Sequence, residues 1–159
     1  MDYYQYMIKL GRLTDYAVTL LTQMVSGREG VWAASDLAEK TGLPMPTVSK
    51  VLKQLAKAGV VETKRGASGG YRLAREASAI SVAMIVEAMD GPIALTECAD
   101  GGNHHCSVEP ICPMNGHWNK ISYAVRQALA AVSLADMVMP SLAPGHPPST
   151  MLRERRDGA

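Results

Sequence analysis

The chain has 159 residues, of which 47% are apolar, so it is long enough for one domain, or for one small domain plus a helix used for association. Its net charge of +1 gives no general indication of a nucleic-acid partner, and no run approaches the roughly 18 apolar residues of a membrane span. No secretory signal is recognisable near residue 1, so we expect a cytoplasmic protein without a membrane partner.

The chain is expected to open with an extension over residues 1–9, in which Met7 is an alternative natural start to Met1. Apolar side chains at helical spacing then predict a first helix that ends at Gly27 or Gly30. Those side chains are Leu13, Ala17, Leu20, Leu21 and Met24.

Two short helices are expected next. Ser35 is the predicted N-cap of a helix over residues 36–40, and Gly42 follows its end. The turn leads to a helix over residues 46–58, whose apolar positions form one stripe. This pair of helices around a glycine-containing turn is typical of a helix-turn-helix.

A β-hairpin should follow the helix-turn-helix. Two short strands, over residues 60–64 and 71–73, flank the loop RGASGG. A helix-turn-helix followed directly by such a hairpin predicts a winged helix. Residues 46–75 also contain seven Lys or Arg against one Glu, a local net charge of +6.

This basic region predicts binding to double-stranded DNA, because lysine and arginine on a slim helix can enter the major groove. The alternative is a solvated helix face beside an ordinary hairpin. Arg65, at the tip of the wing, is expected to reach a minor groove. The candidate contacts on the recognition helix are Pro46, Thr47, Ser49, Lys50 and Lys53.

Another helix is expected between its N-cap Ser81 and the pair Gly91-Pro92. The following loop, residues 91–113, is acidic and contains all the cysteines, as Cys98-x7-Cys106-x5-Cys112. A loop of this length needs an organiser, and clustered thiolates suit an iron–sulfur cluster or zinc. The spacing is looser than the C-x2-C pairs of zinc sites, and three unrelated thiols are the remaining alternative.

Three cysteines leave a fourth ligand to be identified. The local candidates are His104, His105, Asn115 and His117.

The last helix is expected over residues 114–139, with apolar residues spaced alternately by three and four. Such a seam predicts a homodimer, and the alternative is packing on the helix's own domain. The seam comprises Trp118, Ile121, Val125, Ala128, Val132, Ala135 and Met139. Residues 140–159, rich in proline, are expected to form a disordered tail.

The predicted fold class is mainly α with a small β-hairpin wing. The expected parts are a winged helix-turn-helix domain over residues 10–90, a cluster loop over 91–113 and a dimerisation helix over 114–139. No catalytic triad, carboxylate pair or P-loop stands out, so we expect no enzyme. The alternatives are a winged-helix protein-interaction module with structural zinc, and a redox enzyme with Cys112 as nucleophile, which lacks a C-x-x-C motif.

Three segments carry a resemblance: LGRLTDYAVTLL, LAEKTGLPMPTVSKVLKQLAKAGVVETKRGASGGYRLAR and ISVAMIVEAMDGPIALTEC. Over residues 10–139 the chain resembles the Rrf2 family of winged-helix regulators, which includes the IscR, NsrR and RirA types. CPMNGHWNKISYAVRQALAAVSLADM is most similar to the subgroup that regulates SUF iron–sulfur assembly genes. The resemblance implies a homodimeric regulator, such as a repressor, that senses iron, redox state, nitric oxide or cluster status on a pseudo-palindromic operator.

The resemblance also implies a ligand set, with Cys98, Cys106 and Cys112 at the positions of the family's cluster cysteines. In the IscR type a histidine follows three residues after the last cysteine, where this chain has Asn115. In the NsrR type the fourth ligand is an aspartate of the first helix, donated by the other subunit, and the matching residue here is Asp15. Asp15 is therefore the preferred fourth ligand and His117 the weaker alternative.

The nuclearity of the cluster, two-iron or four-iron, stays open. Pro46, Ser49 and Lys50 match the family's base-contacting positions, and Arg65 matches its wing arginine. The triad differs from that of the IscR type, so it gives no operator sequence.

Overall fold

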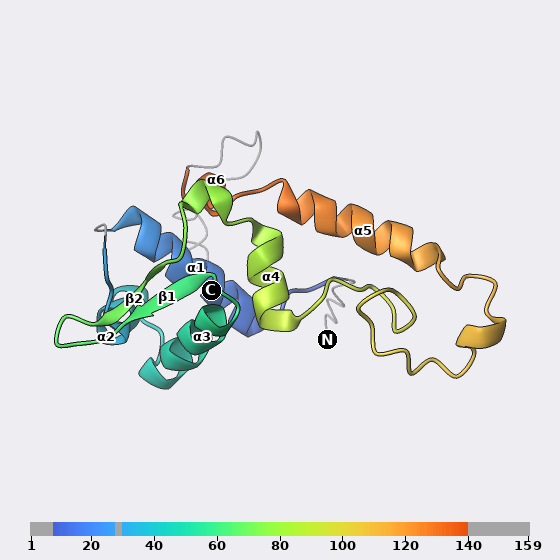
Figure 1. Ribbon diagram of the computed structural model, residues 1–159, viewed down its shortest axis with the longest axis horizontal. Helices are drawn as coiled ribbons and strands as arrows, with labels where there is room; N and C mark the ends of the chain where they lie inside the picture. Colours follow the sequence, from blue (N-terminus) through green and yellow to red (C-terminus); the bar gives the residue numbers. More distant parts are fainter. Residues whose placement is uncertain (1–7, 28–29, 140–159) are drawn as a thin grey trace, which may run out of the picture.

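The computed structural model describes residues 8–27 and 30–139, so most of the expected extension and the whole expected tail lie outside the described residues. Figure 1 shows two parts. A winged body contains the first four helices, the hairpin and the last short helix, and an arm, residues 91–130, projects from it. Among the described residues no helix is both long enough and apolar enough to cross a membrane.

The elements follow one another along the chain as short helices around one hairpin. They are α1 (Arg12–Ser26), α2 (Ala34–Thr41), α3 (Met45–Lys57), β1 (Val61–Lys64), β2 (Gly70–Leu73), η1 (Ala77–Ala79), α4 (Val82–Asp90), η2 (Glu109–Ile111), α5 (His117–Ala130) and α6 (Leu134–Val138). The mainly helical fold with a two-stranded wing is the predicted one.

The helix-turn-helix is confirmed, with one correction at its start. Gly42 follows α2 with a left-handed φ of 69°, and Pro46 lies in the first turn of α3. Ser35, however, is not an N-cap. The helix begins two residues earlier than expected, at Ala34, and its N-cap Ala33 offers no side-chain hydrogen bond. The backbone is extended through Trp32 and Ala33 and turns helical at Ala34, so Ser35 lies inside the first turn of the helix.

The wing is an antiparallel pair in which Val61 faces Leu73 and Lys64 faces Gly70. Trp32 adds a one-residue third strand, because its N–H donates to Tyr71 O at 2.7 Å and its O accepts from Tyr71 N at 2.8 Å. This bridge fixes β2, near its loop end, to the segment that begins α2.

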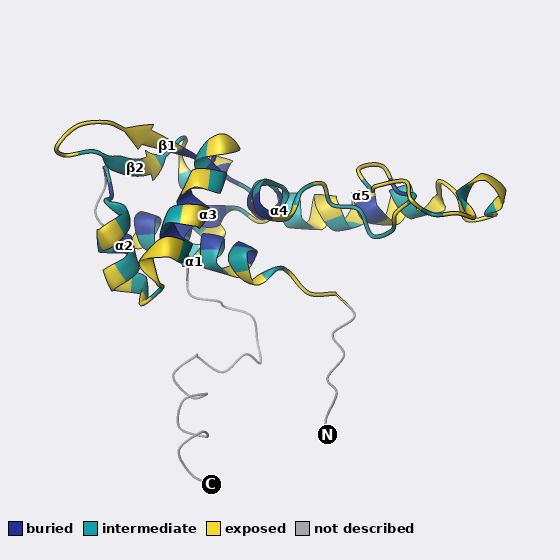
Figure 2. Cartoon of the chain, turned by 90° about the horizontal axis from the view of Figure 1, so that it is seen from below, coloured by how far each residue is buried: buried dark blue, intermediate teal, exposed yellow. Residues whose placement is uncertain are grey.

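The core lies where α1, α3 and α4 meet, and Figure 2 shows that the buried residues gather in the winged body. It is aliphatic apart from Trp32, as expected for a chain without phenylalanine. Its fully buried side chains include Leu20, Leu21, Leu37, Val48, Val51, Leu52, Leu55, Ile80, Ile85 and Leu134.

The prediction of one continuous helix over residues 114–139 is wrong. Helix α5 ends at Ala130, and Ser133 begins α6 with a capping box shared with Asp136. The connector is bonded to the winged body: Val82 N donates to Val132 O at 2.9 Å, and Leu134 N donates to Ile80 O at 2.7 Å. Leu134 is not a seam residue, and its burial in the core turns the chain away from a straight helix.

As a consequence, the last two positions of the expected seam, Ala135 and Met139, are not part of α5. The seam on the arm is shortened to the residues from Trp118 to Ala128, with Val132 in the connector. Whether these residues pair with a second copy stays a prediction.

Leu134→Ala should lower the free energy of unfolding by about 2–5 kcal/mol, because it leaves a cavity in the core. Met137→Ala is the matched control in the same short helix, since Met137 is 46% exposed and its truncation should have little effect. Urea denaturation followed by far-UV circular dichroism measures both. Equal losses for the two variants would show that α6 is not docked through Leu134.

Candidate DNA interface and cysteine loop

Helix α3 buries one side and exposes the other. Val48, Val51, Leu52 and Leu55 face the core, whereas Pro46, Lys50 and Lys53 are exposed and Thr47 and Ser49 are half-buried. The first turn contains no acidic residue, so nothing opposes the positive end of the helix dipole there. The predicted recognition residues therefore share an exposed helix end suited to phosphates and base edges.

The wing places a second basic segment beside this helix. Its tip, from Arg65 to Ser68, is exposed throughout. Arg72 is directed elsewhere, because its Nε donates to Glu62 Oε2 at 2.9 Å across the hairpin. This leaves Lys64 and Arg65 as the basic side chains near the tip.

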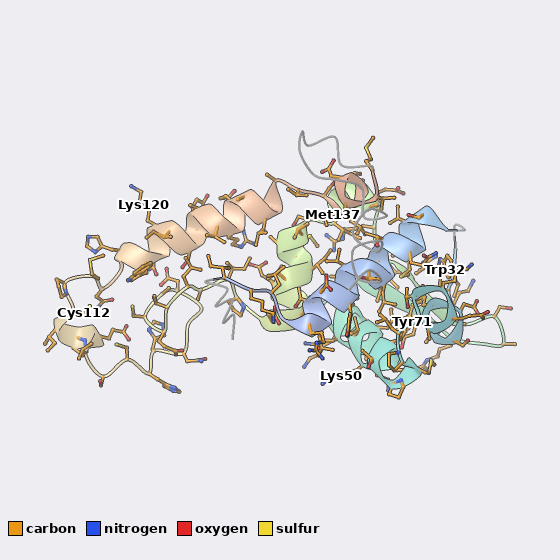
Figure 3. The ribbon with its side chains drawn as sticks, turned by 180° about the vertical axis from the view of Figure 1, so that it is seen from behind. Trp32, Lys50, Tyr71, Cys112, Lys120 and Met137 are labelled. Atoms are coloured by element: carbon orange, nitrogen blue, oxygen red, sulfur yellow. The ribbon has the colours of Figure 1, made fainter. Side chains whose placement is uncertain are left out.

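All three cysteines are half-buried free thiols on the arm. Cys98 Sγ lies 3.4 Å from Thr96 Oγ1. Figure 3 shows Cys112 at the outer end of the arm, far from Lys50 on the winged body. The cysteine loop and the basic end of α3 are thus spatially separate.

The first half of the loop is fastened to α5. The buried Ser122 accepts from Leu95 N at 3.1 Å, and Asn119 Oδ1 accepts from Asp100 N at 2.8 Å. Further along, His104 Nδ1 lies 3.0 Å from Glu109 Oε1. Sequence reasoning did not single out Ser122, a polar residue beside a predicted apolar seam.

The residues that sequence analysis offered as ligands are not brought together. Within residues 8–27 and 30–139 no three of His, Cys, Asp and Glu come close enough to hold a metal ion. Asp15 is exposed in the first turn of α1, in the winged body, and His117 is exposed at the start of α5, with Nδ1 3.4 Å from Asn115 O. Within the described residues, a single chain therefore has candidate ligand side chains but no assembled metal site.

The chemistry of the donor set nevertheless fits an iron–sulfur cluster. Three free thiols in one acidic loop are soft ligands, and none is engaged in a disulfide. A fourth ligand has to come from elsewhere in the chain or from a second copy.

The arm exposes apolar surface. Its seam residues Ile121 and Ala128 are exposed, Trp118 and Val125 are half-buried, and Ser122 is the one buried residue of α5. A paired ionic contact holds the arm near the winged body: Arg126 Nε donates to Glu87 Oε1 at 2.6 Å. This hydrogen bond, helped by the charge of Glu87, raises the pKa of Arg126 above its ordinary value.

A family model described as "Rrf2: Iron-dependent Transcriptional regulator" matches residues 10–140. Among the relatives, NsrR of Oceanobacillus iheyensis is 31% identical, and the match covers 82% of this chain and 90% of NsrR. IscR of Xenorhabdus nematophila is also 31% identical, and the match covers 80% of this chain and 79% of IscR. Among solved structures, IscR of T. potens has a TM-score of 0.60 at 27% identity, covering 91% and 96%. The global cysteine regulator CymR of B. subtilis has 0.62 at 25%, covering 82% and 96%.

Gly70→Ala should detach the wing from Trp32. A Cβ on Gly70, whose φ is 154°, would collide with the backbone carbonyl of Trp32. Hydrogen exchange should show lost protection at the Trp32 and Tyr71 amides. Gly66→Ala is the control, because Gly66 also has a positive φ, of 115°, but open space around the added Cβ. Similar loss of protection in both variants would contradict the expected collision.

Proposed function

The chain belongs to the Rrf2 family of transcriptional regulators, and from this premise we propose that it is a homodimeric, cluster-sensing regulator. The proposal states that an iron–sulfur cluster held by Cys98, Cys106 and Cys112 reports iron, redox state, nitric oxide or cluster supply. The observation that carries it is the combination, on one chain, of an exposed basic helix-turn-helix with wing and three free thiols in one loop.

For DNA binding, α3 enters the major groove with its N-terminal end. Ser49 and Lys50 face base edges, Lys53 contacts the phosphate backbone, and Arg65 of the wing reaches an adjacent minor groove. The same face carries no acidic residue in the first turn of α3, which favours an anionic partner. A regulator of transcription acts in the cytoplasm, where the bacterial chromosome lies.

For dimerisation, the arm supplies the surface. Helix α5 projects from the winged body with exposed apolar side chains, and a second copy of the arm would cover them. A two-fold dimer presents its two recognition helices to a pseudo-palindromic operator.

For sensing, the cluster would supply a redox-active centre and would restrain the cysteine loop that holds it. Loss of the cluster, or damage to it, would change that restraint. Asp15 is our proposed fourth ligand, donated across the dimer. Two features support this choice. Asp15 is exposed on the winged body, and Asn115 stands where the IscR type has its histidine. His117 is the alternative, and control of SUF-type assembly genes is the proposed output.

The binding of an operator should depend on Lys50. Lys50→Ala should weaken binding by about 1–3 kcal/mol, with a shallower dependence of log Kd on log salt. Lys40→Ala is the matched control, because Lys40 is exposed at the end of α2 and outside the proposed interface. Fluorescence anisotropy at several salt concentrations measures both. If the unaltered protein has only a low affinity for operator DNA, and that affinity does not change with salt, the proposed DNA binding is refuted.

The loading of the cluster should require each cysteine. Anaerobic reconstitution with iron and sulfide should give charge-transfer absorbance in the unaltered protein and little in Cys98→Ala, Cys106→Ala or Cys112→Ala. Asp15→Ala should load a more labile cluster, whereas His117→Ala should load as the unaltered protein does. Colourless protein containing zinc would favour a structural zinc site instead, and a more labile cluster in His117→Ala would move the fourth ligand to His117.

A further inference from the structure

The last two residues of α4, Met89 and Asp90, stand directly before the cysteine loop and are held by two other helices. Gln54 of the recognition helix donates from Nε2 to Met89 O at 3.0 Å. Thr14 of α1 donates from Oγ1 to Asp90 Oδ2 at 2.7 Å. One short segment thus joins the root of the loop to the helix that faces DNA and to the helix that carries Asp15.

The contact with Gln54 satisfies a backbone group that α4 itself leaves open. The last carbonyls of a helix have no partner within it, and Met89 O is one of these. Gln54 lies one turn beyond Lys50 on α3, and the bond is partly buried. A shift of the end of α4 therefore acts on the recognition helix through a directional bond as well as through packing.

The contact with Asp90 fixes the start of α1. Its Oδ2 also accepts from Gly11 N at 3.3 Å, so the carboxylate lies at the positive end of the α1 dipole. Thr14 is fully buried, and a Cβ on Gly11 would lie 2.7 Å from Asp90 Oδ1. The fit is tight, so Asp90 and the first turn of α1 are constrained to move together.

The cysteine loop begins directly after Asp90, and its first residue is still bonded to α4. Gly91 follows Asp90 with a φ of 88°, and its N–H still donates to Glu87 O at 3.2 Å. Thr14 is the sequence neighbour of Asp15, the proposed ligand from the other subunit. In the proposed dimer, the loop of one subunit and the Asp15 donated by the other therefore each adjoin the Met89–Asp90 joint of their own subunit.

We propose that Gln54 and Thr14 are positioning residues that transmit the state of the cysteine loop, through Met89 and Asp90, to the recognition helix. The inference rests on the proposed cluster-sensing function. It adds residues that touch neither the cysteines nor the DNA-facing end of α3. When the loop is restrained, the end of α4 holds α3 and α1 in one arrangement. When the restraint is lost, Met89 and Asp90 shift and α3 shifts with them.

The test compares the full-length protein with a Thr14→Val, Gln54→Leu double variant. Both replacements keep approximate volume and remove the polar groups that donate to Asp90 Oδ2 and Met89 O. The matched control is Thr22→Val with Gln23→Leu, two polar residues of α1, of which Thr22 donates to Thr19 O within its own helix. Operator Kd is measured by anisotropy for the cluster-loaded and cluster-free forms of each protein, and hydrogen exchange is measured on the cluster-free forms.

The unaltered protein and the control should show a ratio of about tenfold or more between the two Kd values. In the double variant both forms should still bind the operator, with a ratio within about twofold of one. In the cluster-free double variant, amides over residues 89–95 and in the last turn of α3 should exchange faster than in the control.

A double variant that keeps the ratio of the unaltered protein, or that leaves exchange over residues 89–95 unchanged, overturns this inference and leaves the proposed function standing. A ratio near one in the unaltered protein itself overturns the proposed function, and the inference falls with it. The two failures are therefore separated by the unaltered protein alone.

Discussion

The burial of Leu134 in the core of the winged body determines the shape of the rest of the molecule. Because this side chain is fully buried and its N–H is bonded to Ile80 O, the chain after α5 has to return to the winged body. The arm, residues 91–130, is therefore anchored at both ends, at Asp90 and Gly91 at one and by the connector before Leu134 at the other (Figure 1). Groups carried on the arm can influence the winged body through these ends, through the packing of α5 on α4 and through the Glu87–Arg126 pair.

This geometry gives one reason for both the open ligand set and the exposed apolar surface. In the described residues the arm does not bring Cys98, Cys106 and Cys112 to Asp15 within one chain, and it leaves part of its own seam exposed. In our proposal a second copy solves both problems, because it covers α5 and supplies Asp15. The cysteine loop then becomes a place where cluster status and subunit arrangement depend on each other.

Local sequence signals predicted the winged helix well. Gly42, Pro46 and Ser81 act through their own backbone conformation or a cap two or three residues away, so their effect is readable from the sequence. The prediction of one continuous helix was wrong because the heptad pattern runs on across the break between α5 and α6. The break is caused by Leu134, which is not part of that pattern. The bonds of Met89 and Asp90 join residues 35 and 76 positions apart, and no local pattern indicates them. The cysteines could be proposed as a ligand set from residue type and spacing alone, but their fourth partner could not.

The most direct test of the central claim is the native mass of the full chain purified without oxygen, with iron and sulfide measured on the same sample. The account predicts two chains carrying iron–sulfur clusters, and two chains of which neither retains a cluster after Cys98→Ala. A single chain that contains neither iron nor sulfide, or a dimer that contains zinc in their place, would contradict it.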